Sequence, residues 1–316
     1  MAGDDDEGGR MKNATRDRRS TVESAEIRLA VREWGDRVHP TVVLVHGYPD
    51  NSDVWLPVAE RLRARFHVVA YDVRGAGASS APASKRDYRL EQLAADGAAV
   101  IEATAPGKAV HVVGHDWGSI QSWETVTAPR LQGRIASYTS ISGPCLDHVG
   151  YWMRERLGSG DPRQLAQAAN QILHSWYIAL FQLPLAGPLA WRLGLDRRWP
   201  ALLARLEGLA SVGVNPTQRD DGRTGVQLYR ANFIDRLLHP RERRCDLPVQ
   251  LIVPLRDPFV SPALFEGIER WVPQLSRTDV DGGHWLPLSA PDLVAEQITA
   301  FVERVEGPRT RGASAA

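Results

Sequence analysis

The segment Val110-His111-Val112-Val113-Gly114-His115-Asp116-Trp117-Gly118-Ser119 decides the fold. Its first residues form an apolar run suited to a buried strand, and the residues after Ser119 favour the start of a helix. Glycines two positions before and two positions after Asp116 allow a sharp strand–turn–helix elbow, because a strand and a helix can approach closely there. We therefore expect the Asp116 side chain to project at the carboxyl end of a strand, beside a helix N-terminus that favours negative charge.

An aspartate at the tip of such an elbow predicts covalent chemistry. A carboxylate is already ionised at neutral pH, so Asp116 can attack an electrophilic carbon without a base and form an ester. Opening that ester requires a base that activates water and donors that stabilise the resulting oxyanion. The usual serine esterase is excluded, because Ser119 lies on the wrong side of Gly118 to act.

The remainder of the chain alternates between strand and helix patterns. This alternation predicts an α/β protein with a mostly parallel, doubly wound sheet. The elbow at Asp116 is typical of the α/β-hydrolase fold. A hairpin is expected at 22–35, and strands are expected at 41–45, 66–71, 109–113, 134–142, 248–253 and 276–280. Helices are expected at 52–65, 88–103, 262–271 and 291–305.

The segment after Gly143-Pro144 has helical apolar spacing, proline breaks and no strand pattern, so it is predicted to be an inserted helical lid. The expected organisation is a disordered N-terminal tail at 1–20, an α/β core at 21–144 and 241–306, a helical cap at 145–240 and a C-terminal tail at 307–316. Met11 is an alternative start to Met1.

Two loops that follow late strands carry a candidate acid and a candidate base. The order Asp116, Asp257, His284 is the nucleophile–acid–base order of the α/β-hydrolase triad. His284 has the side chain best suited to activating water near neutral pH, and a carboxylate on its other ring nitrogen would orient it. Asp257 is the preferred carboxylate, with Asp147 as the alternative.

The loop His46-Gly47-Tyr48-Pro49 follows the first central strand and is predicted to supply an oxyanion donor. The backbone N–H of Tyr48, together with that of Trp117, would form the hole. His46 is expected to be structural, and His115 is expected to form pocket wall rather than to transfer protons. Three polar residues of the next loop are expected to tie loops together: Asp72, Arg74 and Ser79.

Five motifs together carry a family resemblance. They are HGYP (46–49), DVRGAGAS (72–79), GHDWGS (114–119), RDP (256–258) and GGHW (282–285). From about Val22 to Val305 the chain resembles the epoxide hydrolases of the α/β-hydrolase superfamily, including actinobacterial members that carry a short-chain dehydrogenase module downstream. The sequence ends before such a module, so no dehydrogenase activity is expected.

The resemblance further implies two lid tyrosines that hold the epoxide oxygen. The segment YIALFQLP (177–184) matches the family's Tyr-x-x-x-Phe-Gln-x-Pro pattern and implies Tyr177, and a looser match at 227–232 implies Tyr229. Phenols stay protonated at pH 7, so they can donate to an alkoxide. Lid aromatics suggest an apolar cavity, with Phe181 and Trp285 as expected pocket residues.

These residues imply an epoxide hydrolase that forms a vicinal diol through an ester on Asp116. The alternative enzyme is a haloalkane or haloacid dehalogenase, which would use the same ester but hold a halide with N–H donors, one of them Trp117 and the other Trp152 or Trp176. The haloacid branch has an arginine directly after the nucleophile, where this chain has Trp117. The third hypothesis is a non-catalytic binding protein with the same scaffold.

The amino-acid composition limits the classes of partner and the compartment that we expect for the protein. The formal net charge is zero, which favours neither nucleic acid nor an anionic membrane. No apolar run is long enough for a membrane span, and the N-terminus lacks a secretory signal pattern. Two cysteines, Cys145 and Cys245, favour a reduced cytoplasmic compartment. We expect no cofactor and no metal, an apolar epoxide and water as substrates, and an oligomeric state that the sequence leaves open, a homodimer included.

Overall fold

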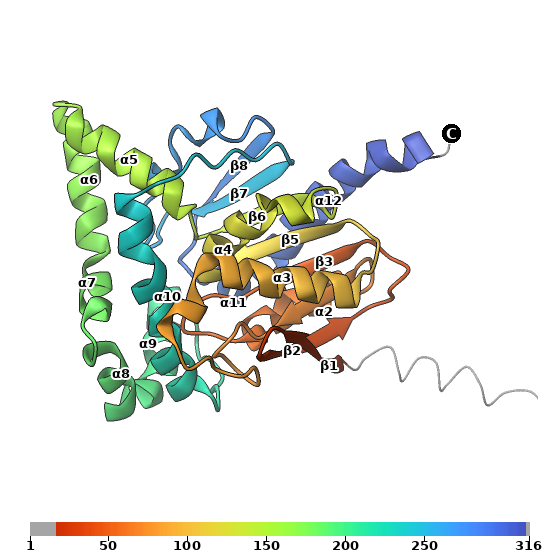
Figure 1. The fold of residues 1–316 in the computed structure, drawn as a ribbon, viewed down its shortest axis with the longest axis horizontal. Coiled ribbons are helices and arrows are strands. Elements are labelled where there is room, and N and C mark those ends of the chain that lie inside the picture. The colour runs from red at the N-terminus through yellow and green to blue at the C-terminus, as the bar shows by residue number, and fades with distance from the viewer. Residues whose placement is uncertain (1–16, 314–316) are drawn as a thin grey trace, which may run out of the picture.

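The computed structural model describes residues 17–313 of the chain, and the side chains of residues 17–307. One eight-stranded sheet forms its centre, in the order β1-β2-β4-β3-β5-β6-β7-β8 (Figure 1). The pairs β1–β2 and β2–β4 are antiparallel, and all later pairs are parallel. The strands are β1 Arg18–Ser24, β2 Ile27–Trp34, β3 Thr41–Val45, β4 His67–Tyr71, β5 Val110–His115, β6 Ile135–Ile141, β7 Val249–Pro254 and β8 Leu275–Val280.

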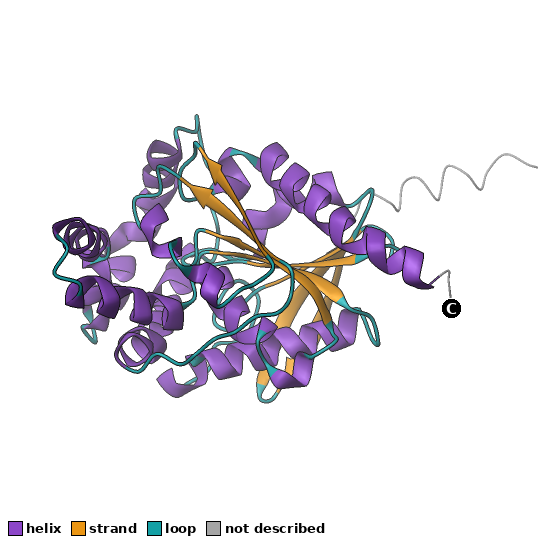
Figure 2. Ribbon diagram, turned by 90° about the horizontal axis from the view of Figure 1, so that it is seen from above, coloured by secondary structure: helices purple, strands orange, loops and turns teal. Residues whose placement is uncertain are grey.

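Both faces of this sheet are covered by helices, which explains why its central strands are apolar throughout (Figure 2). In β3, Val43 and Val45 pack into one core cluster, whereas Val42 and Leu44 pack into the other. The first cluster includes residues of α3 Leu90–Thr104 and α4 Trp117–Val126, and the second includes residues of α2 Leu56–Leu62 and α12 Pro291–Ala313. The predicted α/β class with a doubly wound sheet is confirmed. Short turns and helices complete the core: η1 Ser52–Trp55, η2 Lys85–Tyr88, η3 Pro129–Leu131 and α11 Leu286–Ser289.

All regular structure described between β6 and β7 is helical, as predicted for the lid. These helices, called the cap below, lie together at one end of the sheet (Figure 1). The long helix α10 (Gln218–Leu238) packs against η2 of the core and α5 (Leu146–Gly158) of the cap, so it joins the cap to the core. The cap elements are α5 Leu146–Gly158, α6 Pro162–His174, α7 Trp176–Gln182, α8 Ala186–Ala190, the π-helical turn η4 Trp191–Leu195, α9 Asp196–Glu207 and α10 Gln218–Leu238.

The predicted tails were partly wrong. Residues Arg18, Arg19 and Ser20 belong to strand β1, where they pair with Glu33, Arg32 and Val31, so the strand ladder satisfies their backbone groups. The rest of the expected N-terminal tail, residues 1–16, lies outside the described residues. At the other terminus, α12 continues past residue 307 to Ala313, because adding a residue to a formed helix costs far less than starting one.

The helix predicted at 262–271 was also wrong. The structure has two short 3₁₀ turns there, η5 Pro262–Phe265 and η6 Ile268–Arg270. Gly267 between them has φ 79°, a left-handed conformation that interrupts a helix. Leu264, Phe265 and Ile268 are buried, so the two turns still direct their apolar side chains into the core.

Candidate active site

Asp116 sits on a strained turn between β5 and α4. Its backbone has φ 52° and ψ −123°, a combination that a residue other than glycine adopts only when its surroundings enforce it. The flanking glycines show how it is enforced. A Cβ at Gly118 would lie 2.0 Å from the carbonyl oxygen of Val45, and one at Gly114 would lie 2.5 Å from the Cα of Ser119. Close packing of the elbow therefore requires both glycines, and it fixes the direction of the Asp116 side chain.

Three loops that follow parallel strands bring the predicted nucleophile, acid and base together. The Nδ1 atom of His284 lies 2.7 Å from Oδ2 of Asp257, and its Nε2 atom lies 3.5 Å from Oδ2 of Asp116. All three residues are buried. The other oxygen of Asp257, Oδ1, accepts the backbone N–H groups of Phe259 at 2.8 Å and Val260 at 3.0 Å, which fixes the carboxylate. The arrangement can therefore orient the His284 ring and present Nε2 toward Asp116.

The alternative relay acid, Asp147, is engaged elsewhere. Its carboxylate accepts hydrogen bonds from Arg243 Nε at 2.7 Å, from the backbone N–H of Arg241 at 3.0 Å and from Arg236 at 3.4 Å. It therefore balances buried arginines between the cap and the core. The geometry favours Asp257 as the partner of His284.

The Tyr48 backbone approaches the nucleophile directly. Its N–H donates a hydrogen bond of 2.7 Å to Oδ1 of Asp116, and a Cβ at Gly47 would lie only 2.3 Å from that oxygen. The ring is held from the cap, because Trp191 Nε1 donates to the Tyr48 hydroxyl at 2.7 Å. The other predicted donor, Trp117, is the first residue of α4 and therefore lies at the elbow itself. Sequence reasoning missed the role of Trp191.

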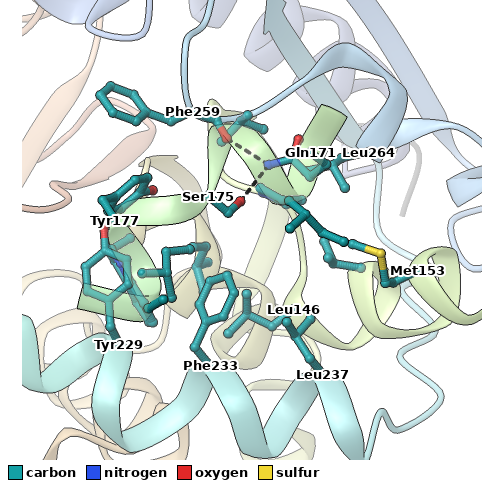
Figure 3. Close-up of a pocket in the computed structure, with 18 of the residues that line it drawn as sticks. Leu146, Met153, Gln171, Ser175, Tyr177, Tyr229, Phe233, Leu237, Phe259 and Leu264 are labelled. Carbon is teal, nitrogen blue, oxygen red and sulfur yellow. Dashed lines mark hydrogen bonds between the residues drawn. The ribbon is translucent and has the colours of Figure 1, made fainter. Parts of the chain in front are cut away.

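Tyr177 on α7 and Tyr229 on α10 line the same cavity as Asp116. Their ring centroids are 6.0 Å apart, and Figure 3 shows the two side chains together at one end of the cavity. Burial raises the pKa of both phenols well above the usual value of 10, and the charge of Asp116 adds to this effect. Both groups are therefore protonated donors at any physiological pH.

His284 carries a proton in this arrangement. Burial acts to lower its pKa, but Asp257 and Asp116 outweigh burial and raise the pKa to about 10. The imidazolium is therefore held between two carboxylates when Asp116 is free. The pKa of His284 therefore depends directly on the charge of Asp116.

His115 was predicted to form pocket wall, and the structure places it differently. It lies beneath His284, with 5.0 Å between the ring centroids, and its Nε2–H donates to the carbonyl oxygen of His284 at 2.8 Å. It is fully buried and is not among the residues that line the cavity. Burial lowers its pKa to about 4, so it is neutral. Its function is to position the His284 backbone.

The cavity beside Asp116 has a volume of about 360 Å³ and is mostly apolar. It extends from the two tyrosines toward Met153 and Leu264 (Figure 3). Its polar side chains are few. The amide nitrogen of Gln171 donates to the Ser175 hydroxyl and the Phe259 carbonyl oxygen, and its amide oxygen accepts the Ser261 N–H. Apolar residues that line it come from α4, four cap helices and the loop after β7, and include Ile120, Leu146, Val149, Ile178, Phe233, Leu237 and Val260.

Neither Phe181 nor Trp285 lines this cavity, contrary to the prediction. Phe181 packs behind the tyrosines, with its ring 5.0 Å from Tyr229 and 5.6 Å from Tyr177, so it supports their positions. Trp285 packs its ring 4.6 Å from His284 on the side of the core. An aromatic residue next to a functional residue in sequence often points to the opposite side, which the sequence alone could not resolve.

Asp50 is a buried acid that sequence reasoning missed. Trp285 Nε1 donates to its Oδ2 at 2.8 Å, which links the loop after β3 to the loop that carries the base. Burial raises the pKa of Asp50 to about 7, although the hydrogen bond from Trp285 acts in the opposite direction. The only signal in the sequence was its place directly after the HGYP motif.

The residues predicted to tie loops together do so. The His46 ring accepts the Val73 N–H at 2.8 Å and bonds to its neighbour's carbonyl group. Asp72 accepts the N–H groups of Ser52 and Ala78, and Ser79 donates to the Asp72 carbonyl oxygen. Arg74 forms a two-pronged ion pair with the buried Asp96. Within residues 17–307, no group of three or more His, Cys, Asp or Glu side chains is placed to hold a metal ion.

Comparison with known proteins identifies the family. Residues 40–291 match the family described as alpha/beta hydrolase fold. The chain is 37% identical over 303 residues to the "Probable oxidoreductase EphD" of Mycobacterium tuberculosis. The aligned residues cover 93% of this chain and 51% of that protein. The chain therefore spans about half the length of this relative. It is 33% identical over 296 residues to "Epoxide hydrolase 4" of Homo sapiens, which covers 89% of this chain and 77% of that protein.

Solved structures show the same fold. An epoxide hydrolase from Bacillus megaterium, in complex with its naphthyloxy-propanediol product, superposes with a TM-score of 0.75 at 22% identity and covers 90% of this chain and 100% of that chain. The epoxide hydrolase VrEH1 from Vigna radiata gives a TM-score of 0.72 at 22% identity, with 91% and 98% covered. The chain belongs to the alpha/beta hydrolase fold family and, within it, to the epoxide hydrolases.

Proposed function

We propose that the protein hydrolyses an apolar epoxide to a vicinal diol. The observation that carries this proposal is the placement of two protonated phenols, Tyr177 and Tyr229, on the wall of the cavity that Asp116 also lines. An epoxide needs a nucleophile at carbon and an acid at oxygen at the same time. The cavity offers both, and the relatives named epoxide hydrolases support the reading.

In the first half-reaction, Oδ2 of Asp116 attacks a ring carbon. A carbon–oxygen bond to the carboxylate forms, and the carbon–oxygen bond of the strained ring breaks. The electron pair of the broken bond goes to the former ring oxygen, which takes a proton from one of the two tyrosines while the other donates a hydrogen bond to it. The product is a hydroxyalkyl ester on Asp116.

In the second half-reaction, His284 acts as the base. Esterification removes the charge of Asp116, which is one of the causes that hold the pKa of His284 near 10, so the imidazolium can release its proton. That proton restores the tyrosine. Neutral His284 then takes a proton from water, and the hydroxide attacks the Cγ atom of Asp116 while the Tyr48 N–H stabilises the charge on Oδ1. The bond between Cγ and Oδ2 breaks, and the diol leaves with Oδ2 as it takes the proton back from His284. The carboxylic acid left on Asp116 then passes its proton to His284, which restores the carboxylate and the imidazolium of the free enzyme.

The cavity defines the substrate class. It is apolar, and Asp116 is the only ionised side chain among the residues that line it, so a substrate with a carboxylate would have no partner. A cavity of 150 Å³ binds benzene, so 360 Å³ accommodates about 14 non-hydrogen atoms. We infer a neutral epoxide with an alkyl or aryl substituent that points toward Met153.

A dehalogenase is the second candidate, and one observation favours it. The buried Nε1–H of Trp117 lies beside the Tyr229 hydroxyl and acts to lower the pKa of that phenol, so it is a donor at the site that a halide could also use. The second tryptophan that a halide site needs is poorly placed. Trp152 is buried beneath the Arg156 guanidinium at 4.2 Å, and Trp176 is largely exposed at the outer wall of the cavity. Two phenols at the site suit an alkoxide better than a halide.

Both cysteines are free and buried, and a chain without disulfides is usual in reducing compartments. We infer a cytoplasmic location for the reaction on this ground.

The experiment is a turnover assay with a panel of neutral 1,2-epoxyalkanes of increasing length, styrene oxide, an epoxide with a terminal carboxylate and the matching 1-bromoalkanes. We expect diol from the neutral epoxides, none from the carboxylate and no bromide release. Asp116→Asn should show no turnover. Bromide release without diol formation would support the dehalogenase, and diol formation by Asp116→Asn would contradict the assigned nucleophile.

A further inference from the structure

The outer surface of the cap carries an apolar stripe that nothing in the reaction requires. Large exposed side chains recur along α6 and α7, which lie end to end on the edge of the cap (Figure 1). With 3.6 residues per turn, the positions on α6 fall within an arc of about 100° and those on α7 within about 40°, and Leu183 directly follows α7. The stripe consists of Leu165, Ile172, Leu173, Trp176, Leu180 and Leu183, of which Leu173 is 70% exposed and Trp176 is 68% exposed.

The stripe is continuous with the wall of the cavity. Ile172 and Trp176 are exposed to solvent, yet both also line the cavity. On the other side of the cavity, α10 contributes Ile234, which lines it and is 51% exposed, and next along the same helix lies Leu238, which is 59% exposed. Exposed apolar side chains on both walls therefore frame the opening between α6–α7 and α10. Contiguous exposed apolar surface of this kind marks an interaction site.

Charge is distributed unevenly over this part of the chain. From Asp161, the N-cap of α6, to Glu207, the last residue of α9, the chain contains five arginines and three carboxylates, although the whole chain has a formal net charge of zero. Asp196 is 15% exposed and pairs with Arg219 at 3.1 Å. The five arginines are all exposed: Arg163, Arg192, Arg197, Arg198 and Arg205. The segment that carries the stripe and continues through η4 and α9 therefore has a net positive charge.

The shape of this region suits helices that lie on a membrane surface rather than helices that cross the membrane. Within the described residues, no single helix is long and apolar enough to cross a membrane. The pair Trp176–Gln182 and Ala186–Glu207 reaches the required length and apolarity only together, and the pair is bent by 98°. Helices with apolar and basic residues that lie in the interface insert leucine and tryptophan side chains while arginines contact lipid phosphates.

We propose that the outer face of α6 and α7, with the arginines of η4 and α9, docks on an anionic lipid bilayer, so that the opening of the cavity faces the lipid. Apolar substrate then enters from the bilayer without crossing water. A second copy of the chain is the competing occupant. It would bring two arginine-rich surfaces together and would cover the opening, so the charge favours the bilayer.

Vesicle flotation tests the docking without substrate, so its result is independent of the proposed reaction. Wild-type protein is mixed with vesicles of phosphatidylcholine alone or with about 30% phosphatidylglycerol. We expect flotation with the anionic vesicles, at least about tenfold less with neutral ones, and weaker binding as salt rises from about 50 to about 300 mM. Protein that stays in the soluble fraction with both vesicles would overturn the proposal.

Paired variants separate this face from ordinary surface. Leu173→Ser with Leu183→Ser should reduce flotation about tenfold, whereas Val38→Ser, at a position 74% exposed on the β2–β3 loop, should leave it unchanged. Arg192→Gln, Arg197→Gln and Arg198→Gln together should reduce it, but the same change at Arg86, Arg89 and Arg130 should not. Unchanged flotation of the leucine variant would overturn the proposal. So would a wild-type dimer that this variant converts to monomer, because the face would then join two copies. Unchanged circular dichroism confirms that each variant is folded.

Discussion

The backbone N–H of Tyr48 holds Oδ1 of Asp116 at 2.7 Å, while Oδ2 of the same carboxylate faces His284. The two oxygens therefore have different tasks before any substrate arrives. Oδ1 is in place to receive the charge of the tetrahedral intermediate, and Oδ2 is the atom that can attack and later leave.

This division predicts where an oxygen label goes. In one turnover in ¹⁸O-labelled water, with enzyme in excess, the label should enter the Asp116 carboxylate and not the diol, because the diol leaves with the original Oδ2. Mass spectrometry of the peptide that contains Asp116 and of the diol measures both. Label in the diol after the first turnover would mean that water attacks the epoxide directly.

Replacement of Asp257 should affect the second half-reaction. Asp257→Asn removes the charge that orients the His284 ring and stabilises its protonated form, so we expect hydrolysis of the ester to slow by about a thousandfold or more, with alkylation affected less. Rapid-quench kinetics separates the two steps. An equal loss in both steps would argue against the assigned role.

Asp147→Asn is the matched control for Asp257→Asn. It leaves the buried Arg236 and the partly buried Arg243 with weaker partners and should lower the free energy of unfolding by about 3 kcal/mol. Its turnover per folded molecule should stay close to that of the wild type.

The two lid tyrosines should each contribute to ring opening. Tyr177→Phe or Tyr229→Phe removes one donor to the developing alkoxide, so we expect alkylation to slow by about a hundredfold for each and to be lost in the double variant. Tyr151→Phe, on α5 against Trp271 at 5.2 Å, should react normally. Wild-type alkylation in the double variant would remove the basis for choosing an epoxide.

The two half-reactions should depend differently on pH. In the free enzyme the pKa of His284 is about 10, and both phenols titrate higher than usual, so alkylation should be nearly constant from about pH 6 to 9. Once Asp116 is esterified, the pKa of His284 falls, and hydrolysis should rise with pH and level off above that lower value. Stopped-flow measurement of both steps tests this. A hydrolysis rate that falls as pH rises would show that His284 acts as an acid in that step.

Much of the site could be predicted because the fold brings residues that follow different strands together at one edge of the sheet. Asp116, Asp257 and His284 each follow a strand of a parallel sheet, and the carboxyl ends of such strands meet at one edge. Tyr177 and Tyr229 came from a family resemblance and not from periodicity, since the apolar spacing of a cap helix does not show which side chains reach the core.

What could not be predicted depends on contacts between distant segments. The hydrogen bond from Trp191 to the Tyr48 hydroxyl joins a π-helical turn to a core loop, and the hydrogen bond from Trp285 to Asp50 joins residues 235 positions apart. His115 was misplaced for a similar reason: its neighbours in sequence do not show that it lies beneath His284. The uneven charge of the cap was hidden by a net charge of zero.

The central claim is that Asp116 becomes alkylated and that His284 is needed to release the product. Intact-protein mass spectrometry of His284→Gln with a neutral epoxide tests it most directly. The account predicts added mass equal to one epoxide, mapped to the peptide that contains Asp116, and no such mass in the variant that also carries Asp116→Asn. An unmodified His284→Gln protein that still forms diol at the wild-type rate would contradict it.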